Sequence, residues 1–62
     1  MKNQILKLHA ELVANGGIVP DSWLPYLELI KLGLKLAEFW TSDDIDKIIE
    51  EIIAAINLLE AA

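Results

Sequence analysis

The 62-residue chain has no cysteine, and its five basic residues are all lysines, so arginine is absent as well. Without cysteine, the fold has neither disulfide bonds nor thiolate ligands for a metal ion. Without arginine, it lacks the side chain that makes most bidentate contacts with phosphates and base edges. Together with a formal net charge of −5, these absences argue against binding to nucleic acid.

Long hydrophobic runs are also missing. The longest uncharged runs cover residues 12–20 and 52–59, far fewer than the ~20 residues that span a bilayer. The apolar stretch near the start of the chain is interrupted by Lys7, His9 and Glu11, so the sequence does not predict a secretory signal. We therefore expect a cytoplasmic protein without a membrane span.

Apolar residues, in contrast, are abundant and make up 55% of the chain. A domain this small buries only about 60% of the surface that its unfolded chain exposes, so a monomer is expected to be marginally stable. The periodicity predicts a single all-α domain over residues 1–62, with helices at about 2–14, 23–40 and 42–60. Short connections between these helices favour a compact bundle.

Local signals indicate where the helices begin and end. The Asn-Gly-Gly sequence at residues 15–17 is a typical C-terminal stop for the first helix. Ser22 is the predicted N-cap of the second helix, with a start one or two residues later as the alternative, because Pro25 disfavours a helical Leu24. Thr41 is the predicted N-cap of the third helix. Trp40 and Ile45 then occupy the two positions of a hydrophobic staple, which predicts that they pack together.

The second predicted helix is apolar over most of its circumference. Its charged residues form one stripe roughly 80° wide at 100° per residue, consisting of Glu28, Lys31, Lys35 and Glu38. Two other helices of the same small subunit cannot cover the remaining surface, so we expect a homo-oligomer, most simply a homodimer. Gly33 and Ala37, one turn apart, favour a close helix crossing. The predicted oligomer interface consists of Tyr26, Ile30, Gly33, Ala37 and Trp40.

The third predicted helix combines a regular apolar seam with the acidic charge of the chain. The seam alternates spacings of four and three residues through Ile45, Ile49, Ile52, Ile56 and Leu59. All of the net negative charge falls in residues 41–62. The acidic residues at the start of this helix are stabilised by the positive end of the helix dipole. The acidic face is also a candidate contact for a basic partner protein, through Asp46, Glu50 and Glu51.

Residues suited to catalysis or metal binding are few. His9 is the only histidine, and it lies on the apolar arc of the first helix, where a core or interface histidine with one hydrogen-bond partner is expected. Neither Ser22 nor Ser42 stands in a nucleophile motif, and the acidic residues lack the spacing of a calcium loop. We therefore expect no enzymatic activity, no cofactor and no metal site.

Three functions are compatible with these features. The first is a small acidic homo-oligomer that binds another macromolecule as an inhibitor or adaptor, and its size and composition are similar to those of small phage-encoded proteins. The second is a protein that holds a small molecule between subunits, with Trp23, Lys31 and Lys35 as candidate pocket residues, although no particular ligand is indicated. The third is a purely structural oligomerisation module.

Overall fold

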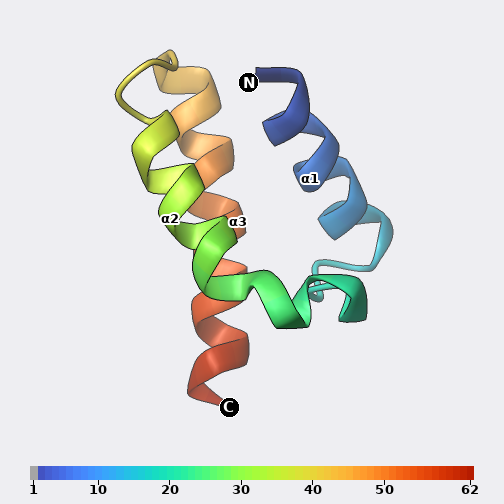
Figure 1. Ribbon diagram of the computed structural model, residues 1–62. Coiled ribbons are helices and arrows are strands. Elements are labelled where there is room, and N and C mark those ends of the chain that lie inside the picture. The colour runs from blue at the N-terminus through green and yellow to red at the C-terminus, as the bar shows by residue number, and fades with distance from the viewer. Residues whose placement is uncertain (1) are drawn as a thin grey trace.

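The computed structural model describes residues 2–62 and confirms the predicted all-α fold. It contains α1 (Lys2–Ala14), a 3-10 helix η1 (Asp21–Tyr26), α2 (Leu27–Ala37) and α3 (Asp43–Ala61), and no strand occurs in these residues. Figure 1 shows that α1 and α3 run in the same direction and that α2 runs opposite to them. The longest helix, α3, contacts both of the others.

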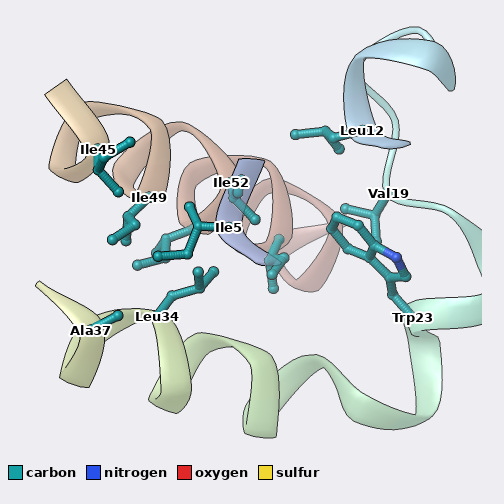
Figure 2. Packing of buried hydrophobic residues seen from close by; sticks show 11 residues of the cluster. Ile5, Leu12, Val19, Trp23, Leu34, Ala37, Ile45, Ile49 and Ile52 are labelled. Carbon is teal, nitrogen blue, oxygen red and sulfur yellow. The ribbon is translucent and has the colours of Figure 1, made fainter. Parts of the chain in front are cut away.

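The hydrophobic core is built around α3 (Figure 2). The side chains of Ile49, Ile52 and Ile56 are fully buried, which confirms most of the predicted seam, whereas Leu59 is partly exposed at its end. The other helices and the connector each add residues to this core, namely Ile5, Leu12, Val19, Trp23, Leu34 and Ala37. Trp23 and Val19 close the core at the end where the connector joins α2 (Figure 2).

The first helix ends as its sequence predicts. Gly16 and Gly17 both have positive φ angles, 72° and 79°, a conformation that residues with a Cβ rarely adopt. The Gly17 N–H donates to the Leu12 carbonyl oxygen at 2.9 Å, and the Gly16 N–H donates to that of Val13 at 3.0 Å. These hydrogen bonds satisfy carbonyl groups that the end of α1 leaves unpaired.

The predicted start of the second helix is wrong. Ser22 is not its N-cap, because the chain first forms η1 and becomes α-helical only at Leu27. Pro25 lies inside η1, where it has no N–H to donate and disfavours an α-helical residue before it. The second helix also ends at Ala37 rather than at Trp40, because residues 38–40 form turns.

The predicted start of the third helix is wrong by one residue. Ser42, not Thr41, is the N-cap of α3, and its side chain makes no capping hydrogen bond. The Thr41 hydroxyl instead lies 3.1 Å from the Ala37 carbonyl oxygen at the end of α2, and it also contacts the Asp46 carboxylate. The predicted staple is not formed either, since Ile45 is buried and Trp40 is largely exposed.

Within residues 2–62, every helix is too short or too polar to cross a lipid bilayer.

Candidate functional site

The outer side of α2 carries a row of exposed apolar side chains. We call it the α2 face and define it by Leu29, Leu32, Leu36, Phe39 and Trp40, which are between 48 and 80% exposed. The leucines recur every three or four residues along α2. The rings of Phe39 and Trp40 extend the row past the end of the helix and lie edge to face, with their centroids 6.1 Å apart.

The charged stripe of α2 forms ion pairs with α3. Lys31 Nζ pairs with the carboxylate of Glu60, and Lys35 Nζ lies 3.1 Å from Glu50 Oε2. The hydrogen bond to Glu60 raises the pKa of Lys31, and the hydrogen bond to Glu50 raises the pKa of Lys35. The charged stripe of α2 therefore lies beside α3, and the apolar side chains next to that stripe are left facing away from the subunit.

The predicted interface residues are only partly available to a second copy. Tyr26 and Trp40 are exposed near the two ends of α2. Ile30, Gly33 and Ala37 line a groove of about 280 Å³ between α1 and α2. Ala37 is buried in the subunit core, which corrects its prediction as an interface contact. No atom lies within 4 Å of where a Gly33 Cβ would be, so within residues 2–62 this position is open to close approach.

A second apolar surface lies between α1 and the C-terminal half of α3. This α1–α3 groove has a volume of about 570 Å³ and is lined by His9, Leu12, Val13, Gly17, Ile18, Val19, Glu51, Ala54, Ala55, Leu58 and Leu59. Val13, Ile18 and Leu58 are each more than half exposed, although they are large and apolar. The groove is absent from the sequence-based predictions because its walls are two helices far apart in the chain.

His9 and Glu51 form the polar rim of this groove. His9 Nε2 lies 2.9 Å from Glu51 Oε2, so the imidazole has a hydrogen-bond partner on α3. The His9 side chain is 27% exposed, so it occupies the edge of the apolar surface rather than the core. Glu51 is 65% exposed, so its carboxylate remains accessible from outside the subunit.

The three acidic residues predicted to bind a basic partner do not form one patch. Glu50 faces α2 through its contact with Lys35, whereas Glu51 faces α1 through its contact with His9. Asp46 is half-buried and contacts the Thr41 hydroxyl. Within the described residues, Glu51 is therefore the one member of this set that borders an exposed apolar groove.

Two carboxylates, those of Glu38 and Glu50, lie close to Lys35 where the C-terminal end of α2 meets α3. Glu38 Oε1 is buried without a hydrogen-bond partner in residues 2–62, and Lys35 Nζ lies 3.9 Å away. A shared hydrogen bond with Glu50 raises the pKa of Glu38, and burial raises it further. The same hydrogen bond, followed by that from Lys35, lowers the pKa of Glu50. This cluster joins the end of α2 to α3, and Glu38 and Lys35 also border a hollow of about 460 Å³ together with Leu32, Leu36 and Phe39.

The residues predicted to hold a small ligand are not brought together. The Trp23 ring is buried in the core, and its Nε1 donates to Glu11 Oε2 at 3.2 Å. Lys31 and Lys35 border a shallow surface hollow between α2 and α3, where both are paired with glutamates. Trp23 does not line that hollow, so within residues 2–62 of one subunit it is not brought together with the two lysines.

Metal-ligating side chains are likewise dispersed. Across residues 2–62, no three histidine or carboxylate side chains are grouped so that they could hold a metal ion. No protein-family model matches this chain, and no curated protein or solved structure shows significant similarity to it.

Proposed function

We propose that this chain is a self-assembling helical protein that acts by binding another protein, with the α2 face joining two copies in a homodimer. The observation that carries the proposal is the row of exposed leucines and aromatic rings on α2. Monomeric proteins rarely expose contiguous apolar patches of more than a few hundred Å². A second copy is the simplest cover, because a two-fold interface uses the same patch on both subunits.

The composition of the α2 face fits such an interface. Aromatic residues are enriched at the energetic centres of protein interfaces, and Phe39 and Trp40 are the two most exposed aromatic side chains in residues 2–62. Gly33 borders the same row and has open space in place of a side chain. A helix of the second copy is therefore able to approach α2 closely beside the leucines.

Sedimentation equilibrium over a range of protein concentrations tests the dimer. The wild type is expected to associate toward twice the subunit mass of 6.9 kDa. Leu29→Lys places a charge on the α2 face and is expected to shift the protein to a 6.9 kDa monomer. Leu58→Lys is the matched control, because Leu58 is similarly exposed but lies on the α1–α3 groove. A wild type that remains monomeric at high concentration would rule out the dimer.

A further inference from the structure

We infer that the α1–α3 groove is the docking site for a basic amphipathic helix of a partner protein. This inference adds a partner class to the proposed protein-binding function, and it places that partner on a different surface from the self-association face. The groove and the α2 face share no residues. One surface therefore remains available when the other is covered.

The shape of the groove favours a helix over a small molecule. Its base includes Ala54 and Ala55, whose short side chains let another backbone come close. Its walls are the exposed side chains of Val13, Ile18 and Leu58. The groove is open along its length, whereas small-molecule sites enclose most of the ligand surface. A docked helix would give the subunit a fourth helix, as in common helical bundles.

The length of the groove sets the length of the partner segment. On α3 the lining residues run from Glu51 to Leu59, which corresponds to about 12 Å, or just over two helical turns. A partner helix of two to three turns, with apolar side chains three and four residues apart, would match this distance. Helix-in-groove recognition uses this spacing of apolar anchors.

The charge of the groove predicts the sign of the charge on the partner helix. Glu51 is the only carboxylate that lines it, and no lysine is among the lining residues within 2–62. The glutamates on the opposite side of α3 are already paired, Glu50 with Lys35 and Glu60 with Lys31. Glu51 contacts the His9 imidazole rather than a lysine, and its side chain is 65% exposed, so its carboxylate can also accept hydrogen bonds from a lysine or arginine of the partner helix.

The test uses two fluorescent helical peptides of about eleven residues, or roughly three turns. Both peptides carry the same leucine face, and they differ only in having lysine or glutamate at every polar position. Binding to the wild type is measured by fluorescence anisotropy. The lysine peptide is expected to bind at least ~10-fold more tightly than the glutamate peptide. A lysine peptide that does not bind, or that binds no better than the glutamate peptide, overturns the inference.

Matched variants separate the groove from a general effect of negative charge. Glu51→Gln and Glu50→Gln remove the same charge from adjacent residues, but only Glu51 lines the groove. Glu51→Gln is expected to weaken binding of the lysine peptide about 5- to 10-fold, and Glu50→Gln less than about 2-fold. Equal losses from both variants would mean that the peptide responds to net charge alone, which contradicts a groove site.

A second pair of variants separates the groove from self-association. Leu58→Ser is expected to weaken peptide binding about 10-fold and to leave the subunit fold intact, because Leu58 is 74% exposed. Leu29→Ser is expected to leave peptide binding unchanged while it disrupts the dimer. If the wild type is monomeric but Leu58→Ser weakens peptide binding, only the dimer proposal fails. If Leu29→Ser weakens peptide binding and Leu58→Ser does not, the groove inference fails.

Discussion

Two helices of this small protein use apolar residues in different ways. In α3, the isoleucines at positions 45, 49, 52, 53 and 56 are all buried. In α2, Leu34 and Ala37 are buried, but Leu29, Leu32 and Leu36 face outward. In α3 the isoleucines recur on one side of the helix and the acidic residues lie outside that side. In α2 the apolar residues cover most of the circumference. An apolar helix therefore need not be a buried helix.

Burial of Leu34 and Ala37 and ion pairs to α3 are both satisfied by the same rotation of α2 about its axis. The lysines of α2 contact Glu50 and Glu60 on α3, so the charged stripe lies along the helix–helix boundary. The apolar arc next to this stripe is then divided between the core and the outer surface. This arrangement leaves a large apolar surface on a 62-residue chain, which is why we assign that surface to a partner copy.

The largest expected difference between the two helices concerns their stability contributions. Ile52→Ala in α3 is expected to lower the free energy of unfolding by about 2–5 kcal/mol, because it leaves a cavity in the core. Leu32→Ala on the α2 face is expected to change it by less than about 0.5 kcal/mol. Urea denaturation at a concentration low enough to prevent association measures both.

If Ile52→Ala does not fold, Ile52→Val serves in its place, with an expected loss of about 0.5–1.5 kcal/mol. A loss in Leu32→Ala as large as that in the α3 variant would show that Leu32 is buried in the isolated subunit. In that case the contrast between the two helices would be wrong.

A smaller effect is expected at the joint between the same helices. Thr41→Ala removes the hydroxyl that contacts the Ala37 carbonyl and Asp46, and it is expected to lower the free energy of unfolding by about 0.5–1.5 kcal/mol. Ser42→Ala is the control, because the Ser42 side chain makes no capping hydrogen bond. Thermal or urea unfolding that finds Ser42→Ala the more damaging change would support the usual N-cap role for Ser42.

The smallest effects are expected from pH. The pKa of Glu38 is raised in the folded protein, so its stabilising contribution is present at low pH and is lost as pH rises through that pKa. Glu38→Gln keeps a hydrogen-bond donor for Glu50 at every pH, so it is expected to melt above the wild type at neutral pH. This difference should shrink as the pH falls through the raised pKa of Glu38.

Glu60→Gln provides a control of opposite sign. The hydrogen bond from Lys31 lowers the pKa of Glu60, so its contribution is present at neutral pH and is lost as pH falls through that lowered pKa. This variant is therefore expected to melt below the wild type at neutral pH, with the gap closing in acid. Melting curves followed by circular dichroism across the acid range measure both variants. Shifts of the same sign would contradict the two environments described for these glutamates.

The sequence predicts those parts of the fold that local signals determine. The bounds of α1 and the buried positions of Ile49, Ile52 and Ile56 follow from the glycine stop and the isoleucine spacing. The start of α2 does not follow from the sequence, because Pro25 is compatible either with a late start of the α-helix or with a 3-10 segment before it. The Thr41 contacts also escape prediction, since the hydroxyl bonds to the Ala37 carbonyl of α2 and to the Asp46 side chain instead of capping a backbone N–H at the start of α3.

The two candidate surfaces were less accessible to prediction. The sequence indicates that α2 has more apolar surface than its neighbours can cover, but it does not show which part faces outward. Of the predicted interface residues, Ala37 is buried within the subunit, whereas Leu29, Leu32, Leu36 and Phe39, which the prediction did not include, are exposed. The α1–α3 groove is lined by residues as far apart in the chain as His9 and Glu51, 42 residues later, so no local pattern indicates it.

Methyl NMR on dilution tests the assignment of the α2 face to self-association without changing the chain. Spectra of the wild type are compared from millimolar to low micromolar concentration. The methyl resonances of Leu29, Leu32 and Leu36 are expected to shift together as the dimer dissociates, while those of Leu58 in the α1–α3 groove stay in place. Shifts confined to Leu58, or no shift at any methyl group, would contradict the homodimer through α2.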